Sequence, residues 1–281
     1  MKILLTGASG LIGQALLASL QPDHDCRTLK LRQPYNVSPS DIAWADAVIS
    51  LNGASLGRVP WTADYRRQIA ASRVNVTTAT ANAIASSTQP PLVWLSASAV
   101  GFYGDRGDET LTEESPAGQG FLAEVTKAWE KATEPAAGYT RVVNLRTGLV
   151  LAEGGALEPL LLATKFGLGA RMGEGSAWWP WVSLADEVGS IVHALDHDIA
   201  GPVNIVGPSP ARSDDVTRGF AKAAGRPYLM RVPAPVLRAA LGQAADELLL
   251  ASQKVRPTKL LGSGYSFVDG DVAAAITAHH Q

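Results

Sequence analysis

The feature that most constrains the fold of this chain is a run of three glycines close to its first residue. The sequence Gly7-x-x-Gly10-x-x-Gly13 follows three apolar residues, 3–5, which predict a buried strand. A helical pattern of apolar residues begins directly after the second glycine. In a strand, glycine turn and helix of this order, the first N–H groups and the positive dipole end of the helix point toward an anion. The order therefore predicts a pyrophosphate site at the carboxyl end of the first strand.

Strand and helix patterns alternate along the first half of the chain. We expect further strands at Cys26–Leu31, Ala47–Leu51, Leu92–Leu95 and Arg141–Leu145, and helices from Ala63 to Ser87 and from Phe121 to Thr133. This alternation predicts a doubly wound parallel sheet with helices on both faces. Such sheets bind ligands at the carboxyl ends of their strands. We therefore expect the ligand loops after residues 6, 31, 52, 96 and 145.

The composition limits the classes of function. The 281 residues are 46% hydrophobic and 18% charged, which predicts a globular protein with a sizeable core. A net charge of −2 gives no sign of nucleic acid or anionic membrane as a partner. The single cysteine, Cys26, cannot form an internal disulfide, and neither a signal-peptide pattern nor an apolar run of membrane-spanning length is present. We expect a cytoplasmic protein, monomeric or homodimeric, with a small-molecule substrate.

Several motifs, taken in their order and spacing, resemble one family. Besides the glycine turn, they are Leu51-Asn-Gly-Ala54, Ser72-Arg73-Val74, Ser96-x-Ser98-Ala99-Val100-Gly-x-Tyr103-Gly104, Trp129-Glu130, Arg146-x-Gly148, Trp181-Val-Ser-x-x-Asp186 and Gly201-Pro202-Val203-Asn204. The chain resembles an atypical extended short-chain dehydrogenase/reductase, and more narrowly the epimerase-family branch of the NAD-dependent epimerase/dehydratase superfamily. The resemblance covers essentially the whole chain and implies a Rossmann-type domain with a nicotinamide dinucleotide.

The second half of the chain predicts a smaller lobe. Glycines and prolines punctuate it, and short helical patterns follow one another in its last hundred residues. We expect a dinucleotide-binding domain over residues 1–155, to whose sheet segments around 180–206 return. Residues 156–281 are expected to form a smaller, mainly helical substrate lobe.

The end of the second strand indicates which dinucleotide is bound. NAD-specific folds place a carboxylate there for the ribose hydroxyls, whereas this chain has Arg32 and no acid until Asp41. A planar, permanently charged guanidinium suits a 2′-phosphate, so we expect NADP(H) rather than NAD. Arg73 is a second candidate phosphate partner or, alternatively, a residue that pins a loop through a salt bridge. The full set of expected cofactor residues is Gly7, Ser9, Gly10, Leu11, Ile12, Gly13, Arg32, Asn52, Gly53, Ala54, Arg73 and Ser96.

The catalytic pattern of the family is incomplete. The resemblance implies a serine followed, one helix later, by Tyr-x-x-x-Lys, whose lysine lowers the tyrosine pKa. Ser98 falls at the serine position, but the tyrosine position falls on Leu122 or Phe121 and the lysine position on Thr126 or Val125. Tyr103 is the nearest other phenol, either as a replacement proton donor or as a packing residue. We therefore predict Ser98 and Tyr103 as candidate catalytic residues.

Other patterns leave three functions open. Trp178 and Trp181 lie where the family brings its substrate lobe over the nicotinamide, and are candidate substrate contacts or packing residues. The histidines show no metal-ligand spacing, so no metal is expected. The candidate functions are an NADP(H)-dependent oxidoreductase on a small carbonyl or sugar-like molecule, a nucleotide-sugar epimerase or dehydratase, and a non-catalytic NADP-sensing or protein-binding module.

Overall fold

The centre of the molecule is a parallel sheet, seen here in a computed structural model that describes residues 1–153, 155 and 157–279. In these residues the sheet has six strands in the order β11-β6-β4-β3-β1-β2, and every neighbouring pair is parallel. The strands are β1 (Lys2–Thr6), β2 (Asp25–Leu29), β3 (Ala47–Ser50), β4 (Val93–Ala99), β6 (Arg141–Thr147) and β11 (Gly201–Ile205). The predicted Rossmann-type fold class is confirmed.

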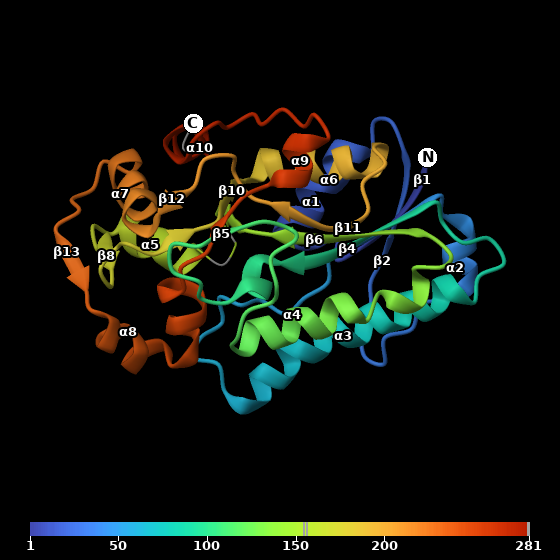
Figure 1. Cartoon of the computed structure of the whole chain (residues 1–281), viewed down its shortest axis with the longest axis horizontal. Helices are drawn as coiled ribbons and strands as arrows, with labels where there is room; N and C mark the ends of the chain where they lie inside the picture. The colour runs from blue at the N-terminus through green and yellow to red at the C-terminus, as the bar shows by residue number, and fades with distance from the viewer. Residues whose placement is uncertain (154, 156, 280–281) are drawn as a thin grey trace.

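Helices cover both faces of this sheet (Figure 1). On one face lie α1 (Leu11–Leu20) and α6 (Leu184–Asp196), which contact each other. On the other face lie α2 (Pro39–Trp44), α3 (Ala63–Ala85) and α4 (Phe121–Lys131). The two longest of these helices, α3 and α6, start at a polar N-cap. Thr62 accepts a hydrogen bond from the Tyr65 N–H, and Ser183 accepts one from the Asp186 N–H.

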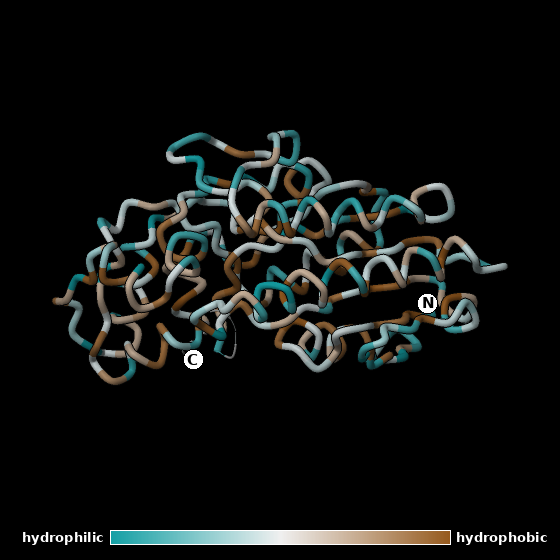
Figure 2. The backbone as a smooth tube through the Cα atoms, turned by 90° about the horizontal axis from the view of Figure 1, so that it is seen from below, coloured by the Kyte–Doolittle hydropathy of each residue, from teal (hydrophilic) through white to brown (hydrophobic). Residues whose placement is uncertain are grey.

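The strands pack by simple alternation. Ile3 and Leu5 of β1 join α1 and α6 in one core, whereas Leu4 faces α2 and α3 in another. Because successive side chains of a strand point to opposite faces, a strand buried on both sides must be apolar throughout. The apolar, brown segments in Figure 2 recur along these strands and again inside the smaller lobe.

The remaining elements form short strand pairs and helices, most of them in the smaller lobe at the left of Figure 1. They are η1 (Val100–Tyr103), β5 (Thr110–Leu111), η2 (Glu134–Ala136), β7 (Leu149–Leu151), α5 (Glu158–Lys165), β8 (Ala170–Met172), β9 (Trp178–Trp179), β10 (Trp181–Ser183), β12 (Ala211–Arg212), α7 (Ser213–Ala223), β13 (Met230–Val232), α8 (Ala234–Leu241), the π-helical η3 (Ala245–Leu250), β14 (Lys254–Val255), α9 (Thr258–Gly262) and α10 (Val272–His279). The lobe has its own apolar core, to which Leu161, Trp181 and Phe220 contribute.

The chain crosses between the two parts more than once. Between residues 180 and 206, α6 packs on the sheet and β11 pairs with β6. Near the other end, α9 contacts β11 while α10 contacts α7 of the lobe. Residue 156, the predicted start of the lobe, lies outside the described residues, so the boundary at 155/156 stays a prediction. Among the described helices we find none with the length and apolar character that a membrane crossing requires.

Candidate functional site

The three glycines of the first turn have different surroundings. A Cβ on Gly7, whose φ is +79°, would lie 2.6 Å from the backbone of Leu51, and one on Gly13 would lie 2.4 Å from the Gly7 carbonyl oxygen. The protein's own backbone therefore leaves no room for a side chain at these two positions. A Cβ on Gly10 would meet only the Gly7 oxygen at 3.5 Å and otherwise faces open space. Gly10 is thus the one of these three glycines beside which there is room for a ligand.

The N-terminus of α1 is free to bind an anion. Its N-cap is Gly10, no side chain caps it, and its first turn has no acidic residue. Ser9 is exposed, and its carbonyl oxygen accepts a hydrogen bond of 3.0 Å from the Gln14 side chain, which steadies the turn. Leu11 and Ile12 are half-buried, and Ile12 packs on the main core, so they face an anion through their backbone N–H groups. These residues fit a dinucleotide pyrophosphate.

The loop after β3 is clamped beside the glycine turn. Asn52 accepts a hydrogen bond from the Thr6 hydroxyl, and the Ala54 N–H donates to the Ser72 hydroxyl at 2.9 Å. The Arg73 guanidinium donates to the carbonyl oxygens of Ile69 and Ala54, both at 3.1 Å. It also lies 3.1 Å from the position of a Cβ on Gly53. Arg73 therefore pins this loop through backbone carbonyl oxygens, and not through the salt bridge predicted from the sequence as the alternative.

Arg73 also remains a cation without a carboxylate. No acidic side chain pairs with it among the described residues, and burial lowers its pKa to about 10. Arg32, after β2, is exposed and likewise has no acidic partner in the described part of the chain. By contrast, the Ser96 side chain is fully buried and its hydroxyl has no hydrogen-bond partner. The structure gives Ser96 no access to a ligand, so its expected cofactor role is not supported.

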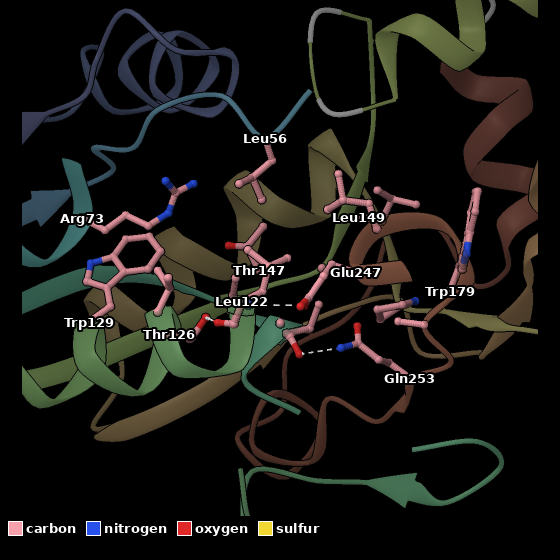
Figure 3. Close-up of a pocket in the computed structure, with 18 residues that line it drawn as sticks. Leu56, Arg73, Leu122, Thr126, Trp129, Thr147, Leu149, Trp179, Glu247 and Gln253 are labelled. Atoms are coloured by element: carbon pink, nitrogen blue, oxygen red, sulfur yellow. Dashed lines mark hydrogen bonds between the residues drawn. The ribbon is translucent and has the colours of Figure 1, made fainter. Parts of the chain in front are cut away.

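A pocket of about 130 Å³ opens at the carboxyl ends of β4 and β6, where the fold predicts a ligand. We call it the sheet-edge pocket. In Figure 3, Arg73 and Trp129 lie at one end of it, Trp179 and Gln253 lie at the other, and Thr147 lies between them. The lining residues are Leu56, Arg73, Ala99, Val100, Gly101, Leu122, Val125, Thr126, Trp129, Thr147, Gly148, Leu149, Trp179, Pro180, Glu247, Leu248, Ala251 and Gln253.

Residues at which the resemblance places the tyrosine and the lysine face this pocket. Leu122 and Thr126 both line it, one helical turn apart on α4. The Thr126 hydroxyl donates to the Leu122 carbonyl oxygen at 2.8 Å, and the Leu122 side chain has no proton to give. The helix is thus placed as the resemblance implies, while its residues lack the usual chemistry.

The two predicted catalytic residues do not reach the pocket. The Ser98 hydroxyl donates to Glu130 Oε1 at 2.6 Å, and Ser98 is 3% exposed. Tyr103 is 0% exposed, and its hydroxyl lies 2.7 Å from Asn204 Oδ1 and accepts a hydrogen bond from Arg146 Nη1 at 2.9 Å. Burial raises the pKa of the Tyr103 phenol. Both hydroxyls are consumed by a buried polar network, so we do not assign them to catalysis.

The predicted tryptophans also point elsewhere. The Trp178 indole donates to Asp108 at 2.7 Å and lies under the Arg212 guanidinium, outside the sheet-edge pocket. Trp181 is buried in the lobe core, where its indole donates to the Ser209 carbonyl oxygen. Trp179, between them, lines the pocket instead. Trp178 and Trp181 therefore do not line this pocket, and their contact with a substrate stays a prediction.

The carboxyl group of Glu187 is buried next to Thr147, and it is not among the site residues predicted from the sequence. The Thr147 hydroxyl donates to Glu187 Oε1 at 2.7 Å, while Glu187 Oε2 has no partner among the described residues. Glu187 is fully buried in the first turn of α6, and this burial raises its pKa to about 8. It is therefore a neutral acid near pH 7. Its spacing from Ile191 and Ala194, both buried, is the helical signal that predicts this inward position.

The high pKa of Glu187 gives a pH-dependent stability. Above pH 4.5 the unfolded chain releases this proton and the folded protein keeps it up to about pH 8, so the stability contributed by the group falls as pH rises between these values. Each pH unit in that window costs about 1.4 kcal/mol. Glu187→Gln keeps an acceptor for Thr147 but does not titrate. We expect the variant to gain stability relative to the parent from pH 5 to pH 7.5 in urea unfolding; a constant difference would contradict a neutral Glu187.

The lobe closes the pocket through two polar side chains. The Glu247 carboxylate of η3 accepts hydrogen bonds from the N–H groups of Phe121 and Leu122, at 2.6 and 3.2 Å, and so caps α4. The Gln253 amide donates to the carbonyl oxygens of Val100 and Gly104. Both residues lie more than 120 positions along the chain from the backbone groups that they bind, which is why no local pattern predicts them. No group of three or more His, Cys, Asp or Glu in the described residues is placed to hold a metal ion.

Comparison with known proteins identifies the family. A family model described as the NAD dependent epimerase/dehydratase family matches residues 3–206, which include the glycine turn and the sheet. The chain belongs to this family. A second model, a domain of unknown function (DUF1731), matches residues 232–278, the segment that supplies Glu247 and Gln253. An epimerase family protein of Mycobacterium leprae is 36% identical, over 98% of this chain and 94% of its own length.

Two solved structures of family members resemble the whole chain. Human epimerase family protein SDR39U1, solved with NADPH, has a TM-score of 0.91 at 29% identity and is matched over 99% of its length by all of this chain. A nucleoside-diphosphate sugar epimerase from Corynebacterium glutamicum has a TM-score of 0.80 at 36% identity. This chain covers 58% of that longer protein.

Proposed function

We propose that this epimerase-family protein is an NADP(H)-dependent oxidoreductase that reduces or oxidises a small carbonyl or alcohol substrate. The observation that carries the proposal is the open anion site at Gly10, together with an exposed Arg32 that has no acidic partner in the described residues. The site fits a pyrophosphate, and the guanidinium fits a 2′-phosphate. The NADPH in human SDR39U1 supports the choice of cofactor.

The chain's own contribution to reduction is a proton for the substrate oxygen. When bound, the cofactor supplies the hydride. Two hydroxyls line the sheet-edge pocket, and that of Thr126 is held by the Leu122 carbonyl oxygen. Thr147 is the better donor because the neutral acid of Glu187 stands behind it. We assign proton delivery to Thr147 and replenishment of its proton to Glu187.

The transfer balances within these two residues. Rotation of the Thr147 hydroxyl allows Glu187 to donate to its oxygen. As the substrate oxygen takes the Thr147 proton, the Glu187 proton moves to Thr147 and leaves a carboxylate. After release of the alcohol, a proton from solvent in the pocket returns to Glu187 through the Thr147 hydroxyl. A positioned acid of this kind contributes on the order of 10²–10⁴ in rate.

Turnover tests this function. Purified protein is incubated with NADPH and a panel of aldehydes and ketones, and consumption of NADPH is followed. We expect Thr147→Val to lower turnover of the best substrate about 10²–10⁴-fold at unchanged NADPH affinity, because valine preserves the shape and removes the hydroxyl. Full turnover in Thr147→Val would contradict the assignment.

One observation favours a second function. Leu122 and Thr126 line the pocket at positions where the resemblance implies tyrosine and lysine. A protein that binds NADP(H) only to sense it or to recruit a partner needs no proton donor at these positions. Tight NADPH binding without turnover of any compound in the panel would favour this non-catalytic module over the oxidoreductase.

A further inference from the structure

A second cavity, of about 230 Å³, lies in the smaller lobe and is lined by apolar residues and glycine throughout. We call it the lobe cavity. Leu160 and Ala163 of α5, Leu237 and Leu241 of α8, and Leu248 and Leu249 of η3 form most of its wall. None of its lining residues carries a charge or a side-chain hydrogen-bonding group. A cavity of about 150 Å³ with such a lining is large enough for benzene.

The lobe cavity adjoins the sheet-edge pocket. Leu149 and Leu248 line both. Leu149 lies two residues after Thr147, the proposed proton donor. The short segment 147–149 therefore lines the sheet-edge pocket with a hydroxyl and the lobe cavity with an apolar side chain. A ligand with its oxygen at Thr147 therefore has an apolar space next to it, across these two leucines.

The lining of the lobe cavity argues against a nucleoside diphosphate in this place, because none of its residues is a cation. Two arginines of the lobe are also engaged with acids: Arg238 with Asp246 at 2.8 Å, and Arg218 with Asp214 at 2.8 Å. A diphosphate needs free cations or helix N-termini. An apolar cavity that stays empty destabilises the fold. A ligand that fills the lobe cavity would remove this cost.

We propose that the lobe cavity receives the apolar part of the substrate, so that the substrate class is a carbonyl compound or alcohol with an aliphatic chain or hydrocarbon ring larger than benzene. This inference rests on the proposed function for the placing of the oxygen at Thr147. The binding of the apolar part rests on the lobe cavity alone. An apolar group in such a site contributes through the removal of its surface from water.

The test is equilibrium binding of straight-chain primary alcohols of increasing length, measured by calorimetry on the full chain in the presence of NADPH. We expect affinity to rise about fourfold for each added methylene until the cavity is filled. Ala163→Phe, which fills the cavity from α5, is expected to weaken binding of the longer alcohols at least tenfold. Ala239→Phe, at an exposed position on α8, is the matched control and should leave it unchanged.

The results separate this inference from the proposed function. Affinity that does not depend on chain length in the unaltered protein overturns the inference, whether or not Ala163→Phe folds. Equal binding of long alcohols by the parent and by folded Ala163→Phe overturns it as well. A clear chain-length dependence combined with no turnover of any carbonyl compound supports the apolar site while it counts against the oxidoreductase.

Discussion

Glu130→Ala is expected to lower the free energy of unfolding by about 3–5 kcal/mol, because it strands a buried guanidinium. Arg146 donates two hydrogen bonds to the Glu130 carboxylate, each of 2.8 Å, and the two side chains are 4% and 14% exposed. Without the carboxylate, the Arg146 charge stays in the interior unpaired, and the Ser98 hydroxyl loses its acceptor. Urea unfolding followed by circular dichroism measures the loss.

The matched control lies on the same helix. Glu124 pairs with Lys127 at the surface, where the two side chains are 66% and 45% exposed. Exposed pairs contribute at most about 1 kcal/mol, so Glu124→Ala should change little. Replacing both buried partners, in Glu130→Met with Arg146→Met, should recover part of the loss because no charge is left unpaired. A loss for Glu130→Ala as small as that for Glu124→Ala would mean that water reaches the buried pair.

The same buried network explains why Ser98 and Tyr103 are not assigned the catalytic role that the sequence motif predicts for them. Ser98 stands at the serine position of the family pattern and Tyr103 is the nearest other phenol, but both hydroxyls are bound to the polar network around Arg146. A sequence pattern gives the position of a residue along a strand and leaves open which partners capture its side chain. Here the capturing residues, Glu130 and Asn204, come from α4 and β11, far along the chain.

The order of elements could be predicted because it depends on local patterns. The glycine turn, the apolar strands and the long helix from Ala63 gave the parallel sheet and its ligand edge. The end of one element differs from the prediction. The strand β4 runs on to Ala99, four residues beyond the predicted Leu95, because its last residues, which include two serines, pair with β6 in the sheet. Hydrophobic runs mark buried strands and miss polar strand residues that are buried with partners.

The candidate site was only partly predictable, because its walls meet from distant segments. The cofactor turn is local and was found, whereas Glu247 reaches α4 from η3, and Glu187 reaches β6 from α6. The tryptophans illustrate the same limit at close range. Trp178, Trp179 and Trp181 are neighbours in sequence, and only the alternation of the short strands β9 and β10 decides which one faces the pocket.

The cofactor site gives the other large effect. Gly10→Val should reduce NADPH affinity more than a hundredfold, because its side chain would fill the space left for the pyrophosphate, while the fold persists since no protein atom obstructs it. Gly13→Val is expected to unfold the turn instead, because its Cβ would meet backbone atoms at 2.4 and 2.8 Å. Circular dichroism separates the two: retained structure in Gly10→Val and loss in Gly13→Val is the expected pair.

Calorimetric titration of the parent and of Arg32→Ala with NADPH and with NADH tests the central claim most directly. Arg32 is predicted to hold the 2′-phosphate, and a charged hydrogen-bonding contact contributes about 1.5–3 kcal/mol. The parent should therefore bind NADPH roughly tenfold to a hundredfold more tightly than NADH. Arg32→Ala should lose that preference while its NADH affinity stays the same. Equal affinities in the parent, or an unchanged NADPH preference in Arg32→Ala, would contradict the account.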